Sequence, residues 1–361
     1  MALSWALAIS TLNRHDVLLE AVKCAVSQTR PPVQVVIVDA SDGWEISYKS
    51  VSSEMRGIPL TYLKAKVKSS SAQRNEAILA SNADIIFLID DDSLMYPDCA
   101  KEIMRVYEHD IDFEIAGIGA TGVARSPKGN DAEFDIKKTG IDTASKFLGG
   151  LSKTRAARFF AQKFLLMKFE ESFLPYNEKS FIKPKLPKLL HGSENFWATN
   201  TIPGYSLTVR TSLAKKHLFD NALRYYAAME DADFCHRLNA DGGLVVCRSA
   251  KVHHYQVSGG RLRRDEVTAL QMLNIAVFLR RHSRSFSQKK RQYYLLVFRK
   301  MIAEFLKDAI AGRFSFPQVR GVFIAMGYIR TVFSTPSGQL DEVYPKIQNQ
   351  ILKSRSIISV R

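Results

Sequence analysis

A short apolar run that ends in three consecutive carboxylates constrains the fold of this 361-residue chain more than any other feature. Five apolar residues, 85–89, run directly into Asp90, Asp91 and Asp92. A short unbroken apolar run predicts a strand that is buried on both faces, as in a parallel sheet. Three like charges at one strand end repel one another, and burial adds to that cost. The pattern therefore favours a bound cation that offsets the charge.

The kind of cation follows from the ligand atoms. Side chains alternate along an extended chain, so Asp90 and Asp92 are expected to point the same way. Ligand sets made only of oxygen favour Mg²⁺ or Mn²⁺ over zinc. The alternative is a solvated acidic turn before a helix, since Ser93 and Pro97 could open one.

The surrounding sequence alternates between buried strands and amphipathic helices. Strands are expected over residues 3–10, 34–38, 60–63, 85–89 and 115–123, and helices over residues 16–27, 72–79 and 97–107. Alternation of this kind predicts an α/β fold with a doubly wound, mostly parallel sheet flanked by helices. After residue 199 the sequence predicts a return to strands, including an edge strand over residues 243–247.

Polar side chains collect where the predicted parallel strands end. These residues are Thr11, Asn13, Arg14, Asp39, Ser41, Asp90, Asp91 and Asp92. In open α/β sheets, ligands bind outside the carboxyl ends of the strands, so these residues are expected to form one site. Neither GxGxxG after the first strand nor GxxxxGK[ST] occurs, which disfavours dinucleotide-binding and P-loop folds.

Four segments, in order, resemble those of family 2 glycosyltransferases, which have the GT-A fold and invert the anomeric centre. They are Thr11-Leu-Asn-Arg14, Val38-Asp-Ala-Ser-Asp-Gly43, Ala72-Gln-Arg-Asn75 and Asp90-Asp-Asp92, the last resembling the DxD motif. The resemblance covers roughly residues 3–124 and 200–258. One departure is Ala40, where a second aspartate is common in the family.

The resemblance implies roles for the residues of the first half. Asp39 would hydrogen-bond the base of a nucleotide-sugar, and Thr11 and Arg14 would line the nucleotide pocket. Arg74 would lie near the diphosphate. Asp92 would bind the metal, with Asp90 beside it. Asn13, Ser41 and Asp91 complete the predicted donor site.

The second half of the resemblance supplies the acceptor side. Residues 202–210 resemble the family's glycine-rich strand, where Gly204 permits close approach of the sugar. Residues 229–242 resemble its Glu-Asp-x-Asp segment. An inverting transfer needs a carboxylate that takes the acceptor proton, and by position Asp231 is the expected base, with Glu230 orienting the acceptor. His254 is expected to complete the metal site.

Charge divides the chain into regions. We expect a nucleotide-sugar-binding half over residues 1–124, a basic helical insertion over 125–198, an acceptor and catalytic half over 199–260, and a basic helical region over 261–361. The last region has 19 Lys and Arg against 6 Asp and Glu, a net charge of +13. Such asymmetry suggests an anionic partner, including an anionic membrane surface.

These observations predict a metal-dependent, inverting hexosyltransferase that uses Mn²⁺ or Mg²⁺. Its donor would be a UDP- or GDP-sugar and its acceptor a hydroxyl of a glycan or lipid-linked acceptor, as in polysaccharide biosynthesis. The alternatives are a sugar-phosphate nucleotidyltransferase and a non-catalytic, membrane-associated binding protein. No nucleic-acid partner is expected, because zinc-finger, KH and RNP signatures are missing from the sequence. Scattered cysteines and an N-terminus without a basic segment predict a cytoplasmic protein, peripheral at most on the inner face of the cell membrane.

Overall fold

The computed structural model describes residues 2–129, 184–225, 229–255, 257 and 262–353. Residues 130–183, the larger part of the basic helical insertion expected over residues 125–198, lie outside these ranges. The chain divides into two compact units. Unit 1 comprises residues 1–136, 183–221 and 230–260, and unit 2 comprises residues 137–182, 222–229 and 261–361.

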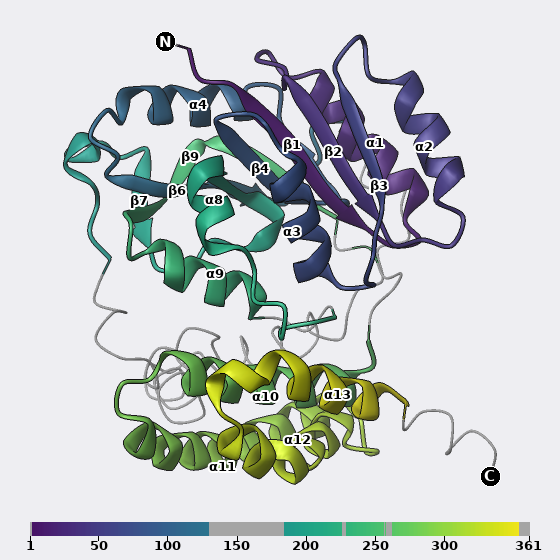
Figure 1. The fold of residues 1–361 in the computed structure, drawn as a ribbon, viewed down its shortest axis with the longest axis vertical. Helices are drawn as coiled ribbons and strands as arrows, with labels where there is room; N and C mark the ends of the chain where they lie inside the picture. Colours follow the sequence, from purple (N-terminus) through teal and green to yellow (C-terminus); the bar gives the residue numbers. More distant parts are fainter. Residues whose placement is uncertain (1, 130–183, 226–228, 256, 258–261, 354–361) are drawn as a thin grey trace. The chain divides into compact units, whose positions relative to one another are not determined.

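Unit 1 is built on a mixed, mostly parallel sheet whose strands run in the order β3-β2-β1-β4-β8-β6-β9-β5, with β7 paired to β9 (Figure 1). The strands are β1 (Trp5–Thr11), β2 (Gln34–Asp39), β3 (Leu60–Lys64), β4 (Ile85–Asp90), β5 (Ser93–Met95), β6 (Ile115–Val123), β7 (Phe196–Thr199), β8 (Leu207–Arg210) and β9 (Gly243–His254). The doubly wound fold class predicted from the sequence is confirmed.

The register of three parallel strands brings their carboxyl ends together. Strand β1 lies between β2 and β4 and pairs in parallel with both. Thr11 is opposite Asp39 in one ladder, and Ser10 is opposite Asp90 in the other. Polar residues that are far apart in sequence therefore meet at one edge of the sheet, as expected for a ligand site.

Both faces of the sheet are covered by helices, and alternate strand residues face each layer. On β4, Phe87 belongs to one core cluster and Leu88 to the other. The first cluster includes residues from α1 (His15–Val26), α2 (Trp44–Ser53) and α4 (Cys99–His109). The second includes residues from α3 (Ser70–Ala80), α8 (Thr211–His217) and α9 (Glu230–Leu238). Two-sided burial explains why the central strands read as continuous apolar runs.

Strand β9 differs from the edge strand expected over residues 243–247. It continues to His254 and pairs with β5, β6 and β7. Its antiparallel ladder with β5 places His254 opposite Ser93, immediately after the three carboxylates. Strand β7 lies within the range expected for the basic insertion, so part of that range joins the sheet.

The described part of unit 2 contains four long helices: α10 (Arg264–His282), α11 (Phe286–Ile310), α12 (Pro317–Ser334) and α13 (Leu340–Lys353). Helix α10 is buried along most of its length, and α12 packs extensively against it. Two tyrosines donate hydrogen bonds to α10, Tyr293 to the carbonyl of Met272 and Tyr344 to Asn274. Among the described residues, we find no helix whose length and hydropathy would allow it to span a bilayer.

Candidate active site

Two carboxylates and an imidazole meet at the end of β4. Ligand atoms of Asp90, Asp92 and His254 all lie within 4.8 Å of one another. His254 Nε2 is 2.9 Å from Asp92 Oδ1 and 3.9 Å from Asp90 Oδ2. The β5–β9 ladder produces this arrangement by bringing His254 back to the carboxylates. The structure thus brings together the three residues predicted to hold a metal.

The electrostatics at Asp92 suit a cation. Burial raises the pKa of Asp92, but the hydrogen bond and charge of His254, together with Arg14, outweigh burial and hold the pKa below its usual range. An ionised, buried carboxylate beside a second carboxylate and an imidazole offers two oxygens and one nitrogen. Such a donor set fits Mn²⁺ or Mg²⁺.

Asp91 points into a different network. Thr11 Oγ1 donates a hydrogen bond to Asp91 Oδ2 at 2.7 Å, and Arg14 Nη1 donates to Oδ1 at 2.9 Å. Burial raises the pKa of Asp91 to about 7, against the opposing effect of Arg14. Three predicted donor-site residues therefore bind one another here, and Asp91 positions Thr11 and Arg14 at the end of β1.

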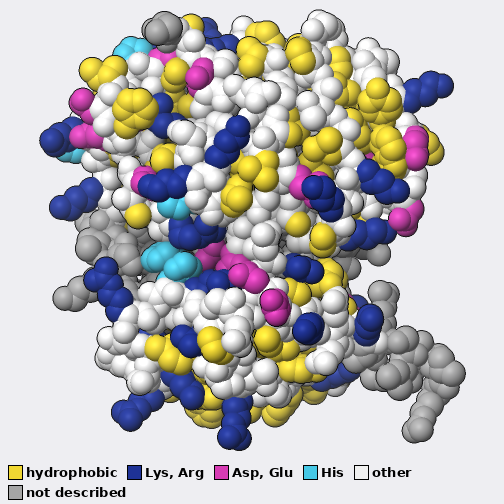
Figure 2. Space-filling view, viewed as in Figure 1, with side chains coloured by type: hydrophobic (Ala, Val, Ile, Leu, Met, Phe, Trp, Pro, Cys, Tyr) yellow, Lys and Arg dark blue, Asp and Glu magenta, His cyan; other side chains and the backbone are white. Residues whose placement is uncertain are grey.

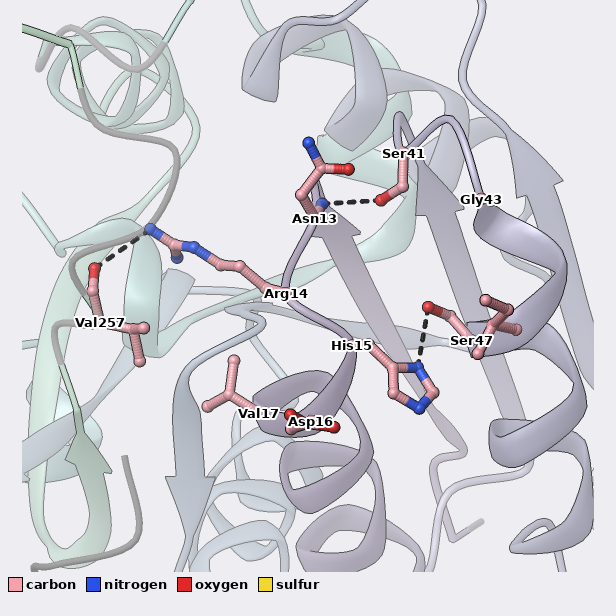
Figure 3. Close-up of a pocket in the computed structure, with 10 residues that line it drawn as sticks. Asn13, Arg14, His15, Asp16, Val17, Ser41, Gly43, Ser47 and Val257 are labelled. Carbon is pink, nitrogen blue, oxygen red and sulfur yellow. Dashed lines mark hydrogen bonds between the residues drawn. The ribbon is translucent and has the colours of Figure 1, made fainter. Parts of the chain in front are cut away.

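A cavity of about 560 Å³ opens beside this network, between the ends of β1 and β2 (Figure 3). Its lining includes Asn13, Arg14 and Ser41, all predicted from the sequence, together with His15 and Ser47 from the first turns of α1 and α2. Ser41 Oγ accepts a hydrogen bond from the backbone N–H of Asn13 at 2.7 Å, as Figure 3 shows. Polar residues from two strand ends thus line one cavity large enough for a small ligand.

Asp39 is fully buried next to this cavity wall. Its Oδ1 accepts a hydrogen bond from the backbone N–H of Ser41 at 2.7 Å. Its Oδ2 accepts one from the Tyr62 hydroxyl at 2.6 Å. The Tyr62 ring stacks on Trp44. The carboxylate predicted to contact a base is therefore occupied by protein donors in this structure.

Arg74 joins the two acidic segments of the site. Its Nη2 is 2.7 Å from Asp90 Oδ1, and its Nη1 is 3.4 Å from Glu230 Oε1. The guanidinium also lies over the ring of Phe219, 5.3 Å from the ring centroid. Since Arg74 is buried, its charge strengthens both contacts. The DxD segment and the start of α9 therefore face the same interior.

Glu230 and Asp231 begin α9, and both are poorly solvated. Burial and the neighbouring Asp231 raise the pKa of Glu230 to about 7, with Arg74 opposing them. Burial also raises the pKa of Asp231. Asp231 Oδ2 accepts a hydrogen bond from the backbone N–H of Gly204 at 3.3 Å. Raised pKa values make both carboxylates stronger proton acceptors than exposed ones.

Three side chains at the site were not predicted from the sequence. Gln73 Nε2 donates to the carbonyl oxygens of Thr11 and Val38, which ties the ends of β1 and β2 together. Tyr62 binds Asp39, and the Tyr205 ring stacks on His254. Gln73 lies inside the Ala72–Asn75 segment, which could have signalled it. An isolated tyrosine carries no such local signal.

Comparison with known proteins identifies a family match and several relatives. Residues 7–170 match the family described as glycosyl transferase family 2. A curated relative, glucosyl-dolichyl phosphate glucuronosyltransferase of Haloferax volcanii, is 25% identical over 138 residues. The match covers 37% of this chain and 44% of that relative, so the chain spans less than half of the relative's length.

Two solved structures are similar in fold. One is GalNAc-T7 with UDP, GalNAc and Mn²⁺, at a TM-score of 0.52 and 12% identity, covering 96% of this chain and 58% of that one. The other is a mannosyltransferase of Pyrobaculum calidifontis with GDP-mannose and Mn²⁺, at a TM-score of 0.48 and 11% identity, covering 98% and 86%.

The sheet and its covering helices have the GT-A fold of glycosyltransferases, which GalNAc-T7 shares. Within that fold, residues 7–170 of this chain match glycosyl transferase family 2. The resemblance stated from the sequence motifs is thereby confirmed.

Proposed function

We propose that the chain is an inverting glycosyltransferase that moves a sugar from a UDP- or GDP-linked donor to a hydroxyl of a glycan or lipid-linked acceptor. The observation that carries the proposal is the position of Arg74, which contacts both Asp90 and Glu230. Because Arg74 contacts both acidic segments, its position supports one site in which the first segment would bind a cation and the second would accept a proton. The GalNAc-T7 structure holds UDP, GalNAc and Mn²⁺, and the Pyrobaculum calidifontis mannosyltransferase structure holds GDP-mannose and Mn²⁺.

The donor would lie along the carboxyl ends of β1, β2 and β4. Its nucleoside would occupy the cavity lined by Asn13, Arg14 and Ser41. Asp90, Asp92 and His254 would hold Mn²⁺ or Mg²⁺, which when bound would neutralise charge on the diphosphate leaving group. Gly204 and Asp231, which are joined by a hydrogen bond from the Gly204 N–H, would lie on the acceptor side.

Asp231 is the proposed general base. Its oxygens are held by the backbone N–H groups of Gly204 and Ala232, at 3.3 and 2.8 Å. In one displacement, the acceptor O–H gives its proton to Asp231 as the oxygen bonds to the anomeric carbon. The bond from that carbon to the diphosphate oxygen breaks, and the nucleoside diphosphate leaves with the electron pair. Glu230 Oε2 is buried, accepts no hydrogen bond from another described residue, and is available to orient the acceptor hydroxyl.

A donor panel tests the proposal. Thermal stabilisation by each nucleotide-sugar with Mn²⁺ identifies the donor, because a ligand that binds the native state raises stability by mass action. Release of UDP or GDP from that donor is then compared between the wild type, Asp92→Asn, Asp231→Asn and a control, Asp112→Asn, on the exposed turn after α4. Loss of turnover in the first two variants alone is expected. Full activity in both would overturn the assignment, and release of pyrophosphate from a nucleoside triphosphate and a sugar phosphate would indicate a nucleotidyltransferase.

The proposal extends to a lipid-linked acceptor and a position at the membrane surface. The curated relative is named for a dolichyl phosphate-linked substrate, which supports a lipid-linked acceptor here. An enzyme with such an acceptor must work at a membrane surface, and we propose a peripheral position on the cytoplasmic face.

A further inference from the structure

Helix α11 of unit 2 has an apolar stripe that faces solvent. Tyr294, Leu295, Phe298 and Phe305 lie at spacings of one, three and seven residues, so they share one side of the helix. The opposite side of the same helix, which includes Tyr293, is buried. A surface helix usually carries polar residues on the side that faces away from the core, so an apolar stripe on that side of α11 is unusual. The exposed stripe therefore calls for an explanation outside the unit's own core.

The stripe continues through the following turn onto α12. The Phe305 ring stacks on Phe316, with ring centroids 5.1 Å apart, just before α12 begins. Phe314 in the turn and Phe323 and Met326 on α12 are also exposed. The seven exposed side chains, which we call the α11–α12 face, are each between 46 and 77% exposed: Tyr294, Leu295, Phe298, Phe305, Phe314, Phe323 and Met326. Scattered exposed apolar residues are ordinary, but such a concentration on two adjacent helices marks an interaction surface.

The charge around this face has one sign. Residues 284–335, all of which the structure describes, contain ten Lys and Arg and two acidic residues. Both acidic residues are buried within the unit: Glu304 pairs with Lys307, and Asp308 pairs with Arg313. Arg291, Arg320 and Arg330 are exposed on the same two helices. Figure 2 shows hydrophobic side chains along the outer edge of this helical unit, with Lys and Arg side chains projecting beside them.

We infer that the α11–α12 face docks onto an anionic phospholipid bilayer. Phe, Leu and Tyr side chains would enter the boundary between headgroups and acyl chains, while the arginines contact lipid phosphates. The absence of exposed carboxylates from residues 284–335 leaves nothing there to repel an anionic surface. This inference goes beyond the proposed transfer reaction, because it rests on unit 2 and needs none of the site residues of unit 1.

The test uses the full chain in flotation assays with phosphatidylcholine vesicles that contain or lack phosphatidylglycerol. Binding is expected only with phosphatidylglycerol, and it should fall as salt rises because the arginine contacts are screened. Leu295→Ser/Phe298→Ser should lower vesicle affinity by at least about tenfold, since two large apolar side chains no longer leave water. Arg320→Gln/Arg330→Gln should lower it by roughly fivefold for each charge removed.

Ile111→Ser is the matched control, because Ile111 is 78% exposed but lies on the turn after α4 in unit 1. This variant should bind vesicles as the wild type does. Unchanged thermal melting shows that each variant folds. Equal binding to both vesicle types, or unchanged binding by both double variants, would overturn the inference. A change in sedimentation coefficient with no change in vesicle binding would instead identify the face as an interface between copies of the chain.

Discussion

Gly204 lies directly against Arg74. A Cβ atom added at Gly204 would fall 2.5 Å from Arg74 Nη2 and 3.1 Å from Cζ. This guanidinium is the group that contacts both Asp90 and Glu230. The glycine predicted from the sequence to admit the sugar therefore also makes room for the residue that joins the two acidic segments.

Gly204→Ala should lower kcat/KM by about 10- to 100-fold, because displacing the Arg74 guanidinium by about 1 Å would disturb the geometry of the reacting groups. The methyl group would force Arg74 away from Asp90, while the surrounding strands stay in place. Steady-state transfer rates measure the effect. Gly327→Ala is the control, since a Cβ there meets nothing within 4 Å. Wild-type activity in Gly204→Ala would show that the Arg74 position is unimportant.

Asp231→Asn should lower kcat by about 10²- to 10⁴-fold, the range for losing a general base, with little change in donor affinity. Single-turnover transfer measures the first quantity and donor titration the second. Because burial raises the pKa of Asp231, the wild-type rate should fall with decreasing pH at a value above that of an exposed aspartate. An equal loss of rate and donor affinity would place Asp231 in donor binding instead.

Glu230→Gln should change how stability depends on pH. Burial raises the pKa of Glu230 from 4.5 to about 7, so between these values the native state binds a proton that the unfolded chain has released. Wild-type stability should therefore decline as pH rises from about 4.5 to about 7 and stay lower above that. Glutamine cannot titrate, so the variant should lack the part of the decline that is due to Glu230, on the order of 3 kcal/mol.

Denaturant unfolding at several pH values measures that slope. Glu342→Gln, at an exposed position on α13, should keep the wild-type profile. A Glu230→Gln profile parallel to the wild type would mean that Glu230 is ionised throughout this pH range.

The strands and helices of the first half were predictable because their signals are local. Helix α1 spans His15–Val26 where residues 16–27 were expected, and β6 spans Ile115–Val123 as expected. Long apolar repeats fix such elements whatever they pack against. Helix α2 was missed, since only two of its ten residues, Ser47 and Val51, are buried and its periodicity is weak.

Pairing between distant strands could not be predicted in the same way. Strand β8 has four residues, all buried, and lies antiparallel between β4 and β6. So short a segment, in which only Leu207 and Val209 are apolar, carries no information about the direction or identity of a partner strand. For the same reason β9 was expected at an edge, although it pairs with three strands.

Some residues of the candidate site could likewise be predicted from local sequence signals, and others could not. Asp39 and Asp90 end β2 and β4, and Asp92 follows two residues after β4. Because β2 and β4 both pair in parallel with β1, the convergence of these strand ends follows from the parallel order. Tyr205 and Tyr62 reach the site through contacts between elements that are remote in sequence. Their roles become visible only once the chain is folded.

Tyr205→Ala should weaken Mn²⁺ binding by about tenfold, the lower end for losing a group that orients a metal ligand. The Tyr205 ring stacks on His254 with centroids 4.6 Å apart and planes 19° apart. Its hydroxyl lies over Gly122, where a Cβ would fall 2.4 Å away. Tyr205→Phe keeps the stack and should bind Mn²⁺ as the wild type does. Equal Mn²⁺ affinity in the alanine variant, measured by calorimetry, would show that the strand alone orients His254.

Tyr62→Phe separates a structural role for Asp39 from a role in base recognition. Without ligand, removing the hydroxyl leaves buried Asp39 Oδ2 without its donor, which should lower the free energy of unfolding by about 1–3 kcal/mol. If the base of the donor binds Asp39, an N–H of that base can replace the lost hydroxyl. UDP with Mn²⁺ should then stabilise Tyr62→Phe more than it stabilises the wild type. Tyr48→Phe, which alters a half-exposed neighbour of the Tyr62 ring, should show no such difference. If Asp39 binds the base, removing the Tyr62 hydroxyl that occupies Asp39 Oδ2 must change the stabilisation by UDP. Equal stabilisation of Tyr62→Phe and the wild type would therefore mean that Asp39 has only a structural role, holding Ser41 and the end of β2.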